Sequence, residues 1–228
     1  MNQWDTFASL FDQRMGDGGD ELHQKCIDPL ILRFLGDFAN SSILDVGCGN
    51  GYLLKKLAKH AKKVVGIDYS KELVSIAKRH LHHQENVQIQ HANIIDPLPF
   101  PDATFEYIIT NMVLQYVPTL ETFALSARHV LKPGGSLIII IDHPAHSLFF
   151  RAQALAGKKE TKFIDNKSYF EFGMRRKKSL WNKAILDYFH RPLKDYINIF
   201  TPHFKLIEFD ELSVDNEIPR IAGFKWKK

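Results

Sequence analysis

The fold is decided by one stretch of sequence, Ile43-Leu44-Asp45-Val46-Gly47-Cys48-Gly49-Asn50-Gly51. Its apolar start predicts a buried strand over residues 42–46, and its three alternate glycines end that strand. A helical pattern that includes Leu53 and Leu57 follows directly. Glycines adopt positive φ and let a ligand touch the backbone, while the first turn of a helix offers free N–H groups to an anion. Strand, glycine turn and helix in this order therefore predict a nucleotide-binding element.

The same alternation of short apolar runs and helical patterns continues through residues 42–142. It is typical of β-α-β units and a parallel sheet. Ser70 is the predicted N-cap of the second helix in this series. We expect strands over residues 42–46, 64–67, 87–90, 105–110, 137–141, 204–209 and 221–226.

The composition of the 228 residues narrows the class of protein. Two cysteines without a CxxC pair argue against a disulfide framework and a cysteine-rich zinc site. The sequence shows neither a run long enough to span a bilayer nor a signal peptide, so we expect a cytoplasmic protein. A net charge of +4 is too small to indicate nucleic acid by itself. The basic run Arg175–Lys178 is either a solvated face or a contact for an anionic substrate or RNA.

The glycine spacing distinguishes between nucleotide classes. Gly47, Gly49 and Gly51 form a GxGxG pattern, whereas dinucleotide folds carry GxGxxG. Asp45 on the preceding strand is also foreign to the dinucleotide fingerprint. Asp68 ends the second strand, where a carboxylate can accept hydrogen bonds from both hydroxyls of a ribose. The pattern favours an adenosine ligand, with an NAD-dependent oxidoreductase as the less supported alternative.

Further motifs follow the glycine loop in register. They are the acidic loop Val65–Ser70, the segment His91–Glu106, the stretch Asn111–Val117 and the turn Leu131–Gly135. As a set they resemble class I S-adenosylmethionine-dependent methyltransferases, and most of all the type 11 subgroup of small-molecule enzymes that includes ubiquinone-biosynthesis methyltransferases. The resemblance implies a Rossmann-like α/β fold with a seven-stranded, mostly parallel sheet and helices on both faces. The implied strand order is 3-2-1-4-5-7-6, with the last strand antiparallel and a lid-like insertion after strand five.

The resemblance also implies one methyltransferase domain over residues 1–228. Its expected parts are an N-terminal cap and helix (1–40), a cofactor-binding core (41–142), a substrate-lid insertion (143–195) and the last strands (196–228). Three glycines at 16, 18 and 19 predict that residues 1–20 are irregular. Residues 21–38 are predicted to be helical, with a break or kink at Pro29.

The resemblance assigns the methionine end of the cofactor to the glycine loop. Gly47, Gly49 and Gly51 would let the methionine part of S-adenosylmethionine lie against the backbone. Asp45 would hold its amino group. Cys48 is interpreted as a small loop residue rather than a nucleophile.

The adenosine end is assigned to the loops that follow the next strands. Asp68 would accept the ribose hydroxyls, and Tyr69 would pack on the adenine face. Asn93 and the N–H of Ile94 would contact the adenine edge, although the family usually has Asp where Asn93 stands. Asn111 would lie near the methionine end.

The implied reaction is in-line displacement of the methyl group onto an O, N or C atom, with S-adenosylhomocysteine as the product. Because the cofactor is already activated, positioning of the acceptor is the main task, and a base is needed only when the acceptor must lose a proton. His143 and His190 are candidate bases, and we expect no metal. The aromatic residues of 143–195 favour a small, partly apolar acceptor. RNA or protein methylation and a catalytically inactive cofactor-binding module are the alternatives, while the pattern leaves the oligomeric state open.

Two further features each have two interpretations. Arg191 could pair with a carboxylate or phosphate of the acceptor, or tie the insertion to the core. The N-terminal aromatics Trp4, Phe7 and Phe11 could cover the cofactor, or simply anchor the N-terminal segment.

Overall fold

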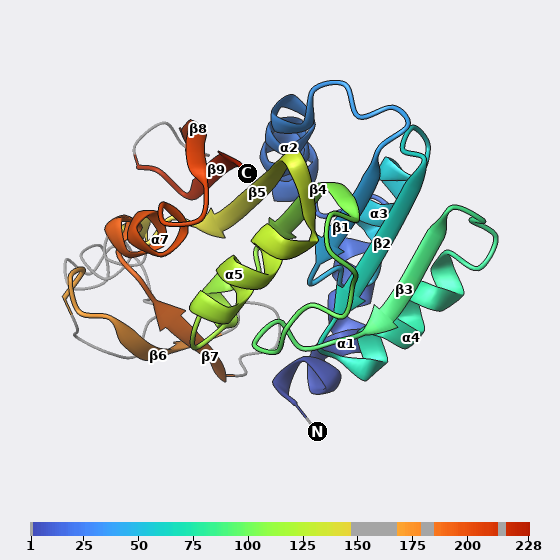
Figure 1. The fold of residues 1–228 in the computed structure, drawn as a ribbon. Helices are drawn as coiled ribbons and strands as arrows, with labels where there is room; N and C mark the ends of the chain where they lie inside the picture. The colour runs from blue at the N-terminus through green and yellow to red at the C-terminus, as the bar shows by residue number, and fades with distance from the viewer. Residues whose placement is uncertain (1, 147–167, 179–184, 214–217) are drawn as a thin grey trace.

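Seven strands form one sheet in the order β3-β2-β1-β4-β5-β9-β8 (Figure 1). The computed structural model describes residues 2–146, 168–178, 185–213 and 218–228. Neighbouring strands are parallel except at β9, which runs antiparallel to both β5 and β8. The predicted order and the antiparallel last strand are confirmed. The strands are β1 (Ser42–Val46), β2 (Lys63–Asp68), β3 (Val87–His91), β4 (Phe105–Asn111), β5 (Leu131–Asp142), β8 (Lys205–Leu212) and β9 (Ile221–Lys227).

Helices cover both faces of this sheet. One face carries α2 (Asp28–Leu35), α3 (Tyr52–Leu57) and α4 (Lys71–His80), and the other carries α5 (Glu121–Val130) and α7 (Leu193–Phe200). The N-terminal helix α1 (Gln3–Met15) packs on α4. A π-helical turn, η1 (His23–Ile27), precedes α2, and a 3-10 turn, η2 (Leu114–Tyr116), follows β4.

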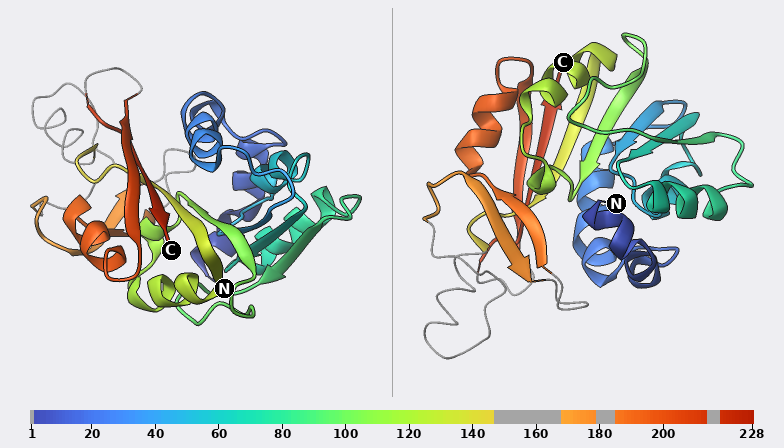
Figure 2. Two further views of the ribbon diagram at one scale, coloured as in Figure 1. Left: turned by 45° about the horizontal axis from the view of Figure 1, so that its top comes forward. Right: turned by 90° about the horizontal axis from the view of Figure 1, so that it is seen from below.

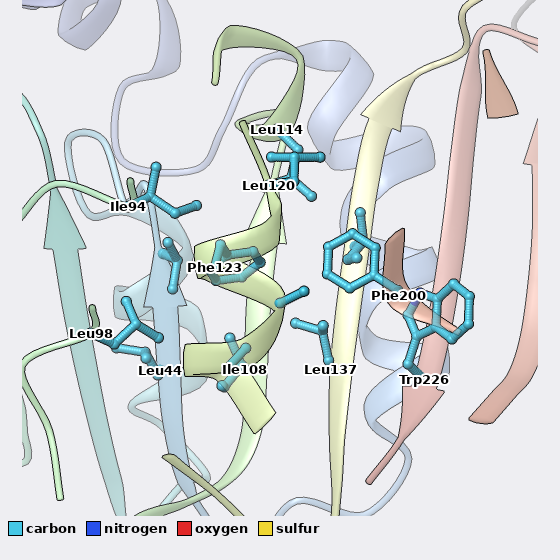
Figure 3. Close-up of a cluster of buried hydrophobic side chains, with 14 of the residues drawn as sticks. Leu44, Ile94, Leu98, Ile108, Leu114, Leu120, Phe123, Leu137, Phe200 and Trp226 are labelled. Carbon is cyan, nitrogen blue, oxygen red and sulfur yellow. The ribbon is translucent and has the colours of Figure 1, made fainter. Parts of the chain in front are cut away.

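Burial on both faces explains the uninterrupted apolar strands. All side chains of Leu137–Ile141 in β5 are fully buried, as expected for a central parallel strand. Figure 3 shows the face beneath α5 and α7, where the ring of Phe200 lies between Phe123 and Trp226. Burying each large apolar side chain contributes about 1.5–3 kcal/mol, so these contacts hold the helices to the sheet.

The parallel register brings the carboxyl ends of the central strands to one edge of the sheet. Asp68 ends β2, Asn111 ends β4 and Asp142 ends β5, while Asp45 is the penultimate residue of β1. Ligands of open α/β sheets bind outside this edge. The topology therefore gathers residues from separate motifs in one place.

The N-terminal segment differs from the sequence-based expectation. The prediction that residues 1–20 are irregular is wrong, because Gln3–Met15 forms α1. Asn2 caps this helix: its Oδ1 accepts the N–H of Asp5 at 2.9 Å, and its own N–H donates to Asp5 Oδ2 at 3.2 Å. This reciprocal capping box fixes the start of the helix, and Gly16, with φ +50°, ends it. The glycines therefore terminate a helix rather than prevent one.

Pro29 does not break the following helical segment. The chain is helical from residue 21 to residue 35, and the turn η1 places Pro29 in the first turn of α2. Proline has no N–H to donate, and the wider π-turn η1 comes directly before it in the chain. The Asp28 N–H donates to the His23 carbonyl, the i−5 pattern of a π-turn.

The insertion after β5 is described only in part. β6 (Gly173–Lys178) and β7 (Ile185–His190) form an antiparallel hairpin that is separate from the main sheet (Figure 2). Tyr188 of β7 packs edge-on against Tyr116 of η2, with ring centroids 6.2 Å apart. Residues 147–167 and 179–184 of the predicted lid lie outside the described residues, so the lid remains a prediction.

Two buried arginines hold the described part of this insertion. Arg175 on β6 donates to the carbonyls of Ser168 and Glu171, so it does not belong to a solvated basic face. Arg191 donates to three backbone carbonyls within residues 114–118. Of the two interpretations of Arg191, a tie between the insertion and the core is the one observed.

A buried charged network joins α2, α3 and β4. The Asp28 carboxylate, 4% exposed, accepts hydrogen bonds from the Tyr52 hydroxyl at 3.1 Å and from Lys56 Nζ at 2.5 Å. Lys56 Nζ also donates to the Gly18 carbonyl at 2.6 Å. The Tyr52 hydroxyl in turn accepts a hydrogen bond from Asn111 Nδ2 at 2.9 Å. The network thus fixes the orientation of Asn111 at the carboxyl edge.

Replacing Lys56 by Met should lower the free energy of unfolding by about 2–3 kcal/mol. The change leaves the Asp28 carboxylate buried without its cation, and the partial exposure of Lys56 reduces the loss below that of a fully buried pair. The double variant K56M/D28N removes both charges and should recover part of the loss. Urea denaturation at pH 7 measures both, and equal losses in the two variants would contradict the ion-pair interpretation.

Candidate active site

The glycine loop turns back onto β2 at the carboxyl edge. Gly47, Gly49 and Gly51 all have positive φ, at +80°, +57° and +85°. The N–H groups of Gly47 and Cys48 donate to the Ile67 carbonyl at 2.8 and 3.0 Å. The loop is thereby fixed to the neighbouring strand, with its backbone turned toward a cavity.

Glycine is required in this loop for two reasons: the φ angles are positive, and there is no room for a Cβ atom. A Cβ at Gly47 would lie 2.2 Å from Val113 Cγ2, and one at Gly49 would lie 2.9 Å from the Phe11 ring. A Cβ at Gly51 would instead meet Leu81 at 2.8 Å, on the side of α4. Gly47 and Gly49 therefore let Val113 and Phe11 approach the loop closely on the cavity side. Gly51 instead lets the start of α3 pack closely against Ala77 and Leu81.

The cavity gathers nearly all of the predicted cofactor residues. Of the predicted set only Gly51 is absent from its lining, because its Cβ position faces Leu81 and Ala77 instead. The predicted residues that line the cavity are Asp45, Gly47, Cys48, Gly49, Asp68, Tyr69, Asn93, Ile94 and Asn111. Cys48 is buried, and burial raises the pKa of its thiol well above the ordinary value, so it is not an activated nucleophile.

Two buried carboxyl groups form the polar floor of the cavity. Asp68 accepts the N–H of Gly49 at 2.9 Å and that of Ser70 at 2.8 Å, one on each oxygen. Burial, opposed by these bonds, raises its pKa above the ordinary value. Asp45 is 2% exposed, and its Oδ1 has no hydrogen-bond partner among the described residues. Burial and the charge of Asp68 raise the pKa of Asp45 to about 8.

Asn111 presents a second unpaired acceptor to the same cavity. Its Nδ2 donates to the Tyr52 hydroxyl, and its Oδ1 is buried without a partner in the part of the chain that the structure describes. An unsatisfied buried acceptor costs about 1–3 kcal/mol. Asp45 and Asn111 can therefore both accept hydrogen bonds from a ligand that brings donors to this end of the cavity.

The residues that follow β2 and β3 form a less polar part of the cavity lining. The Tyr69 ring lines the cavity and is 47% exposed, and it stacks near His91 with centroids 6.3 Å apart. Asn93 Oδ1 accepts the Ile95 N–H at 3.3 Å, which fixes the turn that carries the buried Ile94. An aromatic face beside an amide and an apolar side chain suits a planar heteroaromatic ring.

The helix α1 closes the cavity from the N-terminal side. Asn2 Nδ2 donates to the Tyr69 carbonyl at 3.2 Å, and the Ser70 hydroxyl donates to Asp5 Oδ1 at 2.7 Å. Trp4 lines the cavity and packs edge-on against Tyr116, with ring centroids 4.8 Å apart. Trp4 and Phe11 thus both anchor the segment and cover the cavity, whereas Phe7 does not line it.

The two predicted base candidates lie elsewhere. His143 is buried; its Nδ1 accepts the Ala145 N–H and its Nε2 contacts Glu211 Oε1 at 2.6 Å. Burial lowers its pKa, although Glu211 opposes the shift. His190 is fully buried, and its Nε2 contacts the Tyr169 carbonyl at 2.7 Å. Neither lines the cavity as described, so a base role for either stays a prediction without support from the cavity.

The sequence reasoning missed a charged cluster that does line the cavity. His23 Nδ1 contacts Asp20 Oδ1 at 2.7 Å, and Arg14 Nη2 lies 2.8 Å from Asp20 Oδ2. Burial raises the pKa of Asp20, but the hydrogen bonds from His23 and Arg14 outweigh it and hold the pKa well below its ordinary range. A histidine oriented by a carboxylate can accept a proton at its other nitrogen. Helical spacing in residues 1–20 was the signal that could have located Arg14.

Two more missed residues, Gln115 and Arg220, line the same cavity. No sequence signal marked either of them. The described residues contain no group of three or more His, Cys, Asp or Glu side chains that could hold a metal ion. Within the same residues, no helix is long and apolar enough to cross a membrane.

The strand order and the cavity at the carboxyl edge define a Rossmann-like α/β fold, and comparisons with known proteins agree. Residues 44–139 match the family described as methyltransferase domain. A solved S-adenosylmethionine-dependent methyltransferase from Mesorhizobium loti has the same fold. It superposes with a TM-score of 0.73 at 18% identity, over 88% of this chain and 96% of the other.

Curated relatives match over shorter ranges. A demethylmenaquinone methyltransferase of Tropheryma whipplei is 34% identical over 113 residues, which is 49% of this chain and 46% of the relative. A ubiquinone biosynthesis O-methyltransferase of Coxiella burnetii is 36% identical over 138 residues, 58% of this chain and 57% of the relative. The chain thus spans about half the length of the curated relatives it matches.

Replacing Gly47 by Ala should lower the free energy of unfolding by about 2–4 kcal/mol, because the new Cβ meets Val113 and φ is positive. Gly134 is a matched control, since its φ is +72° but nothing lies within 4 Å of its Cβ position. G134A should lower the free energy of unfolding only by the cost of a positive φ for alanine, about 1 kcal/mol. Urea denaturation compares the two variants, and equal losses would contradict the steric argument.

The pKa of Asp45 predicts how its removal changes the pH dependence of stability. The unfolded carboxyl ionises near pH 4, whereas folded Asp45 holds its proton to about pH 8. Its raised pKa therefore contributes stability that is complete below pH 4 and is lost as pH rises to about 8. Asp45→Asn lacks this loss, so its unfolding midpoint relative to the parent should rise between pH 5 and pH 8. A constant difference across this range, measured by thermal denaturation, would contradict a protonated Asp45.

Proposed function

We propose that the chain binds S-adenosylmethionine in the glycine-loop cavity and transfers its methyl group to a small, partly apolar molecule. The observation that carries the proposal is the buried, unpaired carboxyl of Asp45 beside the left-handed loop of Gly47 and Gly49. The buried Asp45 Oδ1 lacks a hydrogen-bond donor, and the amino group of the cofactor would be such a donor. The methyltransferase-domain match and the relatives' names support the same activity.

The residues present fit the cofactor from end to end. Asp45 and Asn111 offer unpaired acceptors for an ammonium group. The Asp68 carboxylate uses one lone pair on each oxygen for backbone N–H groups and keeps others for two ribose hydroxyls. Tyr69 and Ile94 provide the faces between which an adenine ring would lie.

When bound, S-adenosylmethionine supplies an electrophilic methyl group on a sulfonium sulfur. The chain's own contribution is then to orient the two reactants and to exclude water. Trp4 and Phe11 of α1 cover the cavity, and aromatic faces also suit a sulfonium cation. For an acceptor that must lose a proton, His23 held by Asp20 is the cavity-lining group able to take it.

The acceptor is proposed to be a small molecule rather than RNA or protein. Support comes from the closed position of α1, from the apolar side chains of Val113, Val117 and Leu186 in the cavity lining, and from the quinone-related names of the relatives. Burial of Arg175 removes one member of the basic run that favoured RNA.

Thermal unfolding with S-adenosylmethionine, S-adenosylhomocysteine and NAD tests the proposal. A ligand at about 100 times its Kd stabilises the native state by about 2.7 kcal/mol, which should raise the midpoint by a few degrees for a chain of this length. We expect shifts with the two adenosyl ligands and none with NAD. Asp68→Ala should abolish them. A conservative control, Asp37→Asn on the exposed turn before β1, should keep them.

A shift with NAD alone would contradict the methyltransferase assignment and favour an oxidoreductase. Binding of both adenosyl ligands without turnover of any acceptor would favour the inactive cofactor-binding module. Absence of any shift would overturn the proposed site.

A further inference from the structure

One part of the cavity lining comes from segments at the ends of β4, β5 and β9 rather than from the glycine loop. Gln115 lies in η2 after β4, and Asp142 ends β5. Arg220 directly precedes β9, whose first residue pairs with Asp142 in the sheet. All three residues line the same cavity as the proposed cofactor residues. A molecule beside the cofactor would meet this part of the lining.

Arg220 is held on a fixed backbone but its side chain is unpaired. Its N–H donates to the Leu212 carbonyl at 2.8 Å, and its carbonyl accepts the His143 N–H at 2.8 Å. Its Nε is buried without a hydrogen-bond partner, and no ion pair joins it to a carboxylate in the described ranges. Arg220 as a whole is half-buried, and its buried guanidinium nitrogen is costly to leave without an acceptor.

Gln115 carries the second unpaired group. The residue is 0% exposed, and neither its Oε1 nor its Nε2 has a hydrogen-bond partner within the part of the chain that is described. A buried amide left unpaired on both atoms is destabilising by itself. Gln115 and Arg220 come from distant parts of the chain, so one local irregularity does not explain both.

The walls around these two groups are apolar. Met112, Val117, Pro118 and Leu186 line the cavity. Such a lining binds an apolar body, while a few fixed polar groups orient it. The planar fork of a guanidinium matches the two oxygens of a carboxylate, and an amide N–H adds a further donor.

We propose that Arg220 and Gln115 form the subsite for a carboxylate on the methyl acceptor, so that the acceptor is a small carboxylic acid with an apolar body. The inference rests on the proposed function for the identity of the molecule as methyl acceptor. The subsite itself is an anion-binding site of the cavity and can be measured without turnover.

Isothermal titration tests the subsite with known probes. The probes are benzoate, phenylacetate, 3-phenylpropanoate and octanoate, each compared with its primary amide, on protein with and without saturating S-adenosylhomocysteine. We expect at least one carboxylate to bind 10-fold or more tightly than its amide, since hydrogen bonds to charged groups contribute that much. If no carboxylate exceeds its amide, the inference is overturned.

Variants assign the effect to the two residues. Arg220→Met should weaken the preferred carboxylate at least 10-fold, and Arg220→Lys should fall between it and the parent because the charge is kept but the fork is lost. Arg79→Met makes the same chemical change on the exposed face of α4 and should have no effect. Unchanged affinity in R220M would contradict the subsite.

Gln115→Met separates a binding role from a structural one. It removes an unpaired buried amide at similar volume, so the unfolding midpoint of the free protein should hold or rise while carboxylate affinity falls several-fold. A lower midpoint with unchanged carboxylate affinity would instead show a structural amide. Binding of carboxylates without any binding of S-adenosylhomocysteine would preserve the subsite and overturn the proposed function, and the reverse pattern would do the opposite.

Discussion

The Asp68 carboxylate joins three elements at the carboxyl edge of the sheet. It ends β2, receives the N–H of Gly49 on one oxygen, and receives the N–H of Ser70 at the start of α4 on the other. The glycine loop can reach these positions only because Gly47 and Gly49 adopt positive φ in narrow spaces. Every other part of the site is placed relative to this loop: α1 covers it, and the cavity opens beside it.

The same edge concentrates groups that the fold alone does not satisfy. Asp45 lies buried near Asp68, and the acceptor or donor atoms of Asn111, Gln115 and Arg220 lack partners among the described residues. Each costs stability in the free protein. Their clustering around one cavity is the pattern expected where a ligand supplies the missing partners, since strain and unpaired groups persist at functional sites.

Local sequence patterns were sufficient for the sheet and for the cofactor side of the cavity. Strand order, the Ser70 N-cap and nine lining residues follow from glycine spacing, apolar runs and family motifs. The helix α1 was missed because the glycines after it outweighed its capping box and its helical spacing. Arg220 and Gln115 could not be found, because what distinguishes them is buried side-chain polar atoms without a partner, which only the tertiary structure creates.

A crystal structure of the chain with S-adenosylhomocysteine tests the central claim most directly. We expect the ribose hydroxyls on the Asp68 carboxylate, the amino group within hydrogen-bond distance of Asp45, and the adenine beside Tyr69 and Ile94. We also expect the sulfur to face the part of the cavity lined by Gln115 and Arg220. A ligand bound outside this cavity, or bound within it without contact to Asp45 and Asp68, would contradict the account.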